Sequence, residues 1–131
     1  MMAKKIMLLI VTLFTLFLTL SIGGLTYLHY GQKEVNKTIV NDVDLTTIED
    51  GVYIGEFEGH RWSNKVKVDI DDHKIVDIIT MGDQLFNDEQ VKNELFEQVI
   101  EEQSVDVDVV SGATISSKAY LKAIENALKN G

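Results

Sequence analysis

Residues 108–128 read DVVSGATISSKAYLKAIENAL, and the expected fold is organised around this stretch. The apolar residues of its second half recur at steps of three and four, which predicts one face of an amphipathic helix. Ser111, Gly112 and Thr114 therefore lie on a turn at the helix start. Because a helix N-terminus offers unpaired N–H groups and the positive end of the macrodipole, this turn is a candidate anion site.

A purely structural interpretation of the same turn competes with the anion site. Serine and threonine before a helix commonly cap its first N–H groups, and a glycine before a cap commonly forms only a turn. Spacing alone favours this simpler explanation, since a glycine-containing turn that enters a helix is a weak signal. The identity and order of the residues carry more information than their spacing.

The run Asp108-Val109-Val110-Ser111-Gly112-Ala113-Thr114 resembles the flavinylation motif D-x-x-[ST]-G-A-[ST] of the FMN-binding domain family, and every motif position is matched. This family includes the C subunit of sodium-translocating NADH:quinone oxidoreductase and the G subunit of the Rnf complex. Farther upstream, Asp50-Gly51-Val52-Tyr53-Ile54-Gly55-Glu56 is similar to the usual D-G-x-Y-x-G start of the domain. The resemblance runs from about Asp50 to the C-terminus.

The resemblance implies a specific role for each motif residue. Thr114 is the position that carries FMN through a phosphoester bond, which a separate flavin transferase installs. Ser111, Gly112 and Ala113 shape the turn around the phosphate, and glycine lets the backbone approach a ligand closely. Asp108 is the acidic motif position, and it serves either turn geometry or recognition by the transferase.

The N-terminal segment, residues 1–31, predicts a transmembrane anchor. Residues 6–28 contain no charged side chain, a run long enough to span a bilayer of roughly 30 Å as a helix. Lys4 and Lys5 precede it, so the positive-inside rule places residues 32–131 outside the cytoplasm. The alternative is a secretory signal cleaved near Ser21-Ile22-Gly23.

Charge and cysteine content exclude several classes of function. The chain has 12 basic and 21 acidic residues, and only Lys4 and Lys5 of these lie in the first 31 positions, so the remainder has a net charge of -11. Such an acidic domain is a poor partner for nucleic acid. The chain contains no cysteine, which excludes disulfides, cysteine-based metal sites and iron–sulfur ligation.

Residues 32–49 are polar and acidic, which predicts a linker, and residues 50–131 then form the FMN-binding domain. We expect an α+β fold in which a small antiparallel sheet is covered by two helices and preceded by one transmembrane helix. The predicted strands are 52–58, 65–70 and 74–81, with charged residues on the outer face, and the first helix is 88–102. Residues 105–109 alternate again, as a short strand or an extended approach to the turn.

Four aromatic residues are candidates for stacking on the isoalloxazine ring: Tyr53, Phe57, Trp62 and Phe86. Ordinary core packing is the competing explanation for each of them. Trp62, which lies in a turn beside His60 and Arg61, is the first of the four to test.

No metal site and no catalytic constellation emerges from the sequence. The histidines are not at metal-ligand spacing, and Asp69, Asp71 and Asp72 fit a solvated hairpin turn better than a calcium loop. No Ser–His–Asp arrangement can be argued.

These observations predict a single-pass membrane flavoprotein with an extracytoplasmic domain. It would act as an electron-transfer carrier rather than a stand-alone enzyme, between a membrane redox donor and an extracytoplasmic acceptor. Three alternatives remain open: a module that binds FMN or another phosphorylated ligand without a covalent bond, the flavin subunit of a larger membrane reductase, and a structural surface domain with a vestigial motif.

Overall fold

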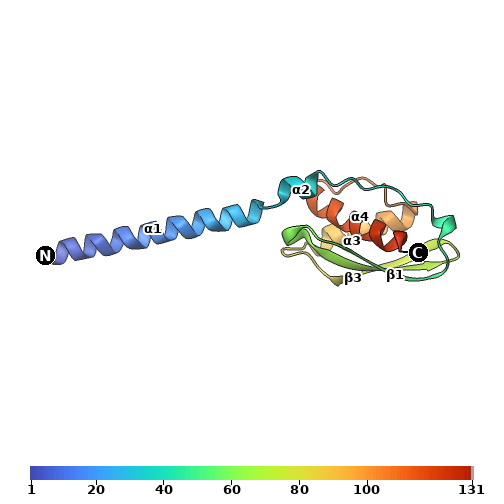
Figure 1. The fold of residues 1–131 in the computed structure, drawn as a ribbon, viewed down its shortest axis with the longest axis horizontal. Helices are drawn as coiled ribbons and strands as arrows, with labels where there is room; N and C mark the ends of the chain where they lie inside the picture. The colour runs from blue at the N-terminus through green and yellow to red at the C-terminus, as the bar shows by residue number, and fades with distance from the viewer. Residues whose placement is uncertain (131) are drawn as a thin grey trace. The chain divides into compact units, whose positions relative to one another are not determined.

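The computed structural model describes residues 1–130, which divide into two compact units between Tyr30 and Gly31. The first unit is the helix α1 (Met2–His29), and the second holds every other helix and strand (Figure 1). An 18-residue window in this N-terminal helical region has a mean hydropathy of 2.5. With 28 residues, α1 is about 42 Å long at 1.5 Å per residue. The chain therefore has an N-terminal helix long and apolar enough to cross a bilayer, as predicted.

The serine and threonine hydroxyl groups of α1 are satisfied within the helix itself. Five side chains donate to carbonyl oxygens three or four residues earlier, at 2.7–3.0 Å: Thr12, Thr15, Thr19, Ser21 and Thr26. A hydroxyl bonded in this way does not need water. The threonine content of α1 is thus compatible with a hydrocarbon environment.

The sheet of the second unit has three antiparallel strands in the order β1-β2-β3, which confirms the predicted meander. The strands are β1 (Gly51–Phe57), β2 (Asn64–Asp71) and β3 (Lys74–Gly82). In the central strand, Val66, Val68 and Ile70 are buried, as their strict alternation predicts.

The outer face of the sheet is less charged than the sequence suggested. β2 does present lysines and aspartates there, but Ile54 of β1 and Ile79 of β3 flank Lys67 and are exposed. The expectation of charged outer positions is therefore correct for the central strand and correct only in part for its neighbours, where Glu56 and Asp77 share this face with the exposed isoleucines. Isoleucine favours a β-strand whichever face of the sheet it lies on. The sequence pattern of β1 and β3 therefore did not distinguish the inner face from the outer face.

Two long helices, α3 (Glu89–Glu102) and α4 (Thr114–Lys129), lie together on one face of the sheet (Figure 1). They bury apolar residues against the inner face of the sheet, and the principal contributors are Leu95, Phe96, Val99, Tyr120, Ile124 and Leu128. Asp88 caps α3, since its carboxylate accepts hydrogen bonds from the N–H groups of Gln90 and Val91 at 2.9 and 3.3 Å. The α+β class, with a small sheet covered by helices, is confirmed.

Gly55 determines how closely α4 approaches the sheet. A Cβ atom on this glycine would lie 2.2 Å from the backbone nitrogen of Ala127, which no side chain could tolerate. The helix is further tied to β1 by Asn126 and Asn130, whose side-chain amides donate to the carbonyls of residues 56 and 54 at 2.9 Å. These bonds pair carbonyl groups on an edge strand and place the C-terminal end of α4 beside β1.

The segment predicted as a linker, residues 32–49, is instead part of the second unit. It contains the short helix α2 (Gln32–Asn36) and the 3₁₀ turn η1 (Leu45–Thr47), and it buries Val35 and Ile48. The backbone N–H of Asn41 also donates to buried Glu125 of α4 at 3.0 Å. The buried positions follow no regular period, so the polar composition concealed them.

Residues 105–110 approach the motif in an extended form but join no strand of the sheet among the residues described. Val105 is buried, and Val107 and Val110 pack against the core. Of the two forms that the alternation allowed, the extended approach is therefore the one observed.

Candidate functional site

The motif residues form a tight turn that ends at the first residue of α4. The N–H of Ala113 donates to the carbonyl of Val110 at 3.0 Å, and Gly112 has φ of 80°. This left-handed conformation favours glycine. A Cβ at Gly112 would find no atom within 4 Å, so the space beside the turn is open to a ligand.

The N-terminus of α4 lacks the cap that the structural interpretation of the turn required. Ala113 is the N-cap residue, and among the described residues no side chain accepts from the first-turn N–H groups. In contrast, Asp88 caps α3. Ser111 and Thr114 are both exposed and do not serve as caps. The unpaired N–H groups and the helix dipole therefore remain available for an anion.

Ser117 forms hydrogen bonds with both ends of the turn. This residue was not identified from the sequence. Its fully buried hydroxyl accepts a hydrogen bond from the N–H of Val110 at 3.2 Å, and its own N–H donates to the carbonyl of Ala113 at 2.9 Å. Both ends of the turn are thereby fixed to the first turn of α4. A serine at this helical position carries no distinctive sequence signal.

Two hollows of similar size flank the turn and share Gly112, Ala113 and Ser116. The first, of about 370 Å³, is also lined by Gln32, Arg61, Trp62, Thr114 and Ile115. The second, of about 340 Å³, is also lined by Phe86, Asp88, Val91, Ser111 and Tyr120. The hydroxyl residues of the motif thus face different sides, with Thr114 on the first hollow and Ser111 on the second.

The aromatic candidates differ in their relation to the turn. Trp62 lines the first hollow but is only 2% exposed, since it packs against Val35 and Ala119. Phe86 lines the second hollow and is 66% exposed. Phe86 is therefore the more accessible of the two rings, and the guanidinium carbon of Arg61 lies 5.9 Å from its centroid.

The structure brings neither Tyr53 nor Phe57 to the turn, and Asp108 is exposed outside both hollows. Tyr53 packs against the core and donates its hydroxyl to the carbonyl of Glu49 at 2.7 Å. Tyr53 lies in β1 next to Ile54. The carbonyl of Ile54 accepts a hydrogen bond from the C-terminal end of α4, whereas Thr114 is at the N-terminal end. The core-packing interpretation is therefore the correct one for Tyr53.

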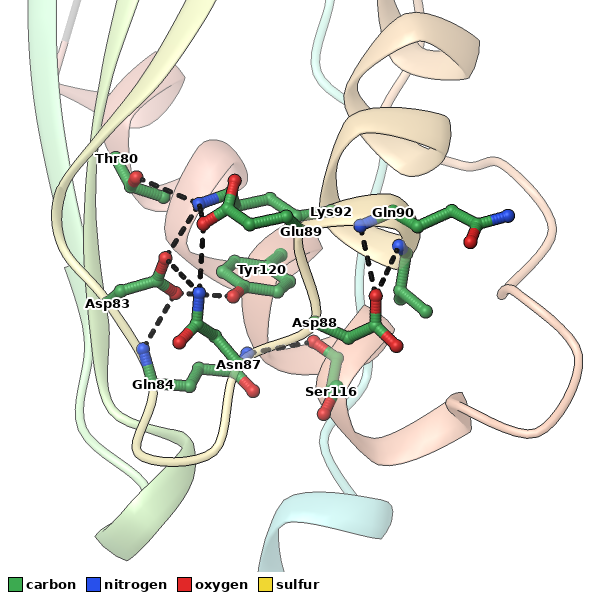
Figure 2. A network of polar contacts seen from close by, with 11 residues as sticks. Thr80, Asp83, Gln84, Asn87, Asp88, Glu89, Gln90, Lys92, Ser116 and Tyr120 are labelled. Carbon is green, nitrogen blue, oxygen red and sulfur yellow. Dashed lines mark hydrogen bonds and ion pairs between the residues drawn. The ribbon is translucent and has the colours of Figure 1, made fainter.

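A polar network lies beside the second hollow, and Figure 2 shows its members converging on Asp83. The ammonium of Lys92 contacts the carboxylates of Asp83 at 2.7 Å and Glu89 at 2.8 Å. The hydroxyl of Tyr120 donates to the other oxygen of Asp83, and the N–H of Gln84 donates to the same oxygen at 2.8 Å. This network joins the loop after β3 to α3 and α4.

The network shifts the pKa of three of its groups. Burial raises the pKa of the Asp83 carboxyl, but hydrogen bonds from Lys92 and Tyr120 lower it by more, so it lies below the ordinary value. Burial lowers the pKa of Lys92, and its hydrogen bonds to Asp83 and Glu89 raise it by more. Burial and the hydrogen bond to Asp83 together raise the pKa of Tyr120. At neutral pH, Asp83 and Lys92 are therefore ionised and Tyr120 is a neutral donor.

The loop between β3 and α3 is fixed against the turn by further bonds. The side-chain amide of Gln84 donates to the carbonyl of Ser116 at 3.0 Å, and the N–H of Leu85 donates to the carbonyl of Arg61 at 2.9 Å. Phe86 follows with φ of 60°, a conformation that is costly for an aromatic residue. The loop thus holds an exposed aromatic side chain beside the motif.

No group of histidine or acidic residues within residues 1–130 is arranged to hold a metal ion. Asp69, Asp71 and Asp72 lie at the β2–β3 hairpin, where Asp72 and His73 form the turn. The hairpin interpretation of these aspartates is therefore correct. A larger hollow of about 750 Å³, lined in part by Glu56, Glu58 and Asn64, contains no motif residue.

The open space at Gly112, the uncapped helix and the exposed Thr114 fit a bound phosphate, and the two hollows leave room for a flat ring. Comparison with known proteins also points to a protein that binds a flavin phosphate. The profile of the FMN-binding domain matches residues 59–129, more than half of the chain. A stretch of 82 residues, 60% of this chain, is 34% identical to NADH:acrylate oxidoreductase of Vibrio harveyi. The match spans only 8% of the length of that protein.

The fold is also found in a solved structure. The crystal structure of the CPE2226 protein from Clostridium perfringens is similar with a TM-score of 0.53 and 26% identity. The similarity covers 64% of this chain and 88% of that one. The chain belongs to the FMN-binding domain family, and FMN is its cofactor.

Proposed function

We propose that Thr114 carries FMN through a phosphoester bond and that the domain works as an electron carrier. The observation that carries this proposal is the exposed Thr114 hydroxyl at the uncapped start of α4, within a complete flavinylation motif. A flavin transferase can reach an exposed hydroxyl without unfolding the domain. Ser111, Gly112 and Ala113 form the turn that leaves this hydroxyl accessible.

When bound, FMN supplies the redox chemistry, and the protein supplies binding, orientation and electrostatics. The first-turn N–H groups of α4 stabilise the phosphate charge, a contribution of about 0.3–1 kcal/mol at an exposed helix end. That contribution is too small to retain a dissociable cofactor outside the cell, so a covalent bond to Thr114 accounts for retention. Phe86, with its exposed ring, is the aromatic residue best placed to contact the isoalloxazine.

We further propose that α1 anchors the protein, with Lys4 and Lys5 in the cytoplasm and the domain on the outer side. A membrane redox protein would then be the electron donor, and the acceptor would lie outside the cytoplasm. Cleavage of α1 as a secretory signal would place the domain on the same side without an anchor.

Intact-mass measurement of the full chain co-expressed with a flavin transferase tests the linkage. We expect a mass increase of one FMN less water, and a fluorescent band on a denaturing gel. Thr114→Ala should abolish both signals. Thr47→Ala, which changes another exposed threonine, should leave them intact. An unmodified wild-type protein would reject the linkage, and a fluorescent Thr114→Ala protein would reject the assigned residue.

A second candidate is the flavin subunit of a larger reductase. In the Vibrio harveyi NADH:acrylate oxidoreductase, the stretch that matches this chain is a small part of a much longer protein. A separate anchored domain would then work beside the remaining redox domains on other chains. Co-purification of the tagged protein with a membrane redox complex would favour this candidate, and a protein that purifies alone would favour the independent carrier.

A further inference from the structure

The chain contains a single arginine, Arg61, and the structure holds it beside the flavinylation motif. Its guanidinium carbon lies 4.1 Å from the centroid of the Trp62 ring. Trp62 is 2% exposed and is therefore a fixed platform rather than a mobile surface ring. The carbonyl of Arg61 also accepts the N–H of Leu85 at 2.9 Å. Stacking and the backbone bond therefore restrain Arg61 before any ligand arrives.

Arg61 also dominates the charge near Thr114. It lines the same hollow as Thr114, and among the described residues that line either hollow it is the one basic side chain. The one acidic lining residue, Asp88, belongs to the other hollow and already accepts two backbone N–H bonds. In a domain with a strong excess of acidic residues, Arg61 is therefore the positive side chain that shares a hollow with Thr114.

We propose that Arg61 is the counter-ion of the phosphate that links FMN to Thr114, an inference that rests on the proposed linkage. A phosphodiester carries one negative charge on two non-bridging oxygens. The guanidinium fork can donate two parallel N–H bonds to such a group, and the ring of Trp62 keeps the fork in plane. Arg61 is thus a positioning residue, which orients the phosphate from the hollow while the N–H groups of α4 approach it from the helix.

Phosphorus-31 NMR of the flavinylated full chain in detergent micelles tests this assignment. The variants are Arg61→Gln, which removes the charge, and Arg61→Lys, which keeps it. Lys74→Gln removes the same charge from the β2–β3 hairpin, away from both hollows. Intact mass first establishes that each sample carries FMN, and Trp62 fluorescence establishes that each is folded.

We expect Arg61→Gln to displace the resonance of the linking phosphate most. Arg61→Lys should displace it less, because it keeps the charge but not the fork, and Lys74→Gln should leave it close to the wild-type position. A resonance that Arg61→Gln does not move would overturn the proposal. So would a resonance that Arg61→Lys displaces as far as Arg61→Gln does, because the positive charge at position 61 would then have no effect on the phosphate. A wild-type protein without FMN would reject the proposed linkage itself.

A second measurement needs no variant and decides the question if Arg61→Gln does not fold. Since the chain has one arginine, its Nε–Hε cross-peak in a nitrogen-15 spectrum is assigned directly. We expect this peak to move between the unmodified and the flavinylated full chain. An identical peak position in the two forms would overturn the pairing.

Discussion

The ammonium nitrogen of Lys92 lies 2.7 Å from a carboxylate oxygen of Asp83, and the lysine side chain is only 8% exposed. This pair connects α3 to the loop that carries Phe86, and Tyr120 connects the same carboxylate to α4. This polar network therefore ties the loop to the helices on either side of the flavinylation motif. Removing Asp83 would leave the nearly buried ammonium of Lys92 with fewer partners.

Lys92→Met should lower the free energy of unfolding by about 1–3 kcal/mol, because Asp83, whose side chain is 24% exposed, loses its charged partner and its hydrogen bond. Lys74→Met, at an exposed hairpin position, should change it by less than about 0.5 kcal/mol. Urea unfolding followed by the fluorescence of Trp62 measures both. Equal effects of the two substitutions would mean that the Asp83–Lys92 pair does not stabilise the fold.

The stability of the domain should fall at acid pH. Asp83 and Glu125 both have lowered pKa values in the folded state, so each contributes stability above the unfolded-state value of about 4. That contribution is lost as the pH falls from about 4 through the folded-state pKa values. Asp83→Asn should reduce the acid dependence without abolishing it, because Glu125 still titrates. Urea unfolding at a series of pH values tests this, and an unchanged slope in Asp83→Asn would contradict it.

Two glycines should respond differently to alanine. Gly55→Ala places a Cβ 2.2 Å from the backbone of α4, so we expect a loss of at least about 2 kcal/mol of unfolding free energy, or failure to fold. Gly112→Ala meets open space but must adopt φ of 80°, which costs about 1–2 kcal/mol. Thermal unfolding of the two variants gives the comparison. A Gly112→Ala variant that is less stable than Gly55→Ala would contradict the packing of α4 on β1.

The segment 32–49 should behave as part of the domain. Ile48→Ala should cost about 2–4 kcal/mol of unfolding free energy, because this isoleucine is 2% exposed in the main core. The matched control is Ile39→Ala in the same segment, where the side chain is 72% exposed and little change is expected. Urea unfolding distinguishes them. If both substitutions were neutral, the segment would be a true linker in solution.

The orientation of the chain can be tested with introduced cysteines, since the sequence has none of its own. Asp106→Cys, at an exposed position of the domain, should react with a membrane-impermeant maleimide on intact cells. Ala3→Cys, beside the two N-terminal lysines, should react only after lysis. The reverse labelling pattern would place the domain in the cytoplasm and refute the extracytoplasmic assignment.

Much of the fold followed from local patterns. The alternation of Val66, Val68 and Ile70 predicted the central strand. Helical spacing predicted α3 with nearly its observed bounds, and it predicted a helix directly after the motif, which is α4. The repeat of apolar residues along a segment shows which face of the helix or strand is apolar. In this domain, those apolar faces pack together in the core. The motif before α4 was likewise sufficient to predict a turn at a helix start and the family of the domain.

Other features depended on contacts between distant residues. The burial of Val35 and Ile48, the partnership of Asp83 with Lys92, and the approach of Arg61 to Thr114 join positions far apart in the chain. Whether Ser111 or Thr114 caps α4 also depends on the geometry of the completed turn. The sequence by itself determined the elements and the residue expected to bear the flavin. Only the tertiary structure decided which side chains surround it, because burial and charge pairing arise when separate elements pack together.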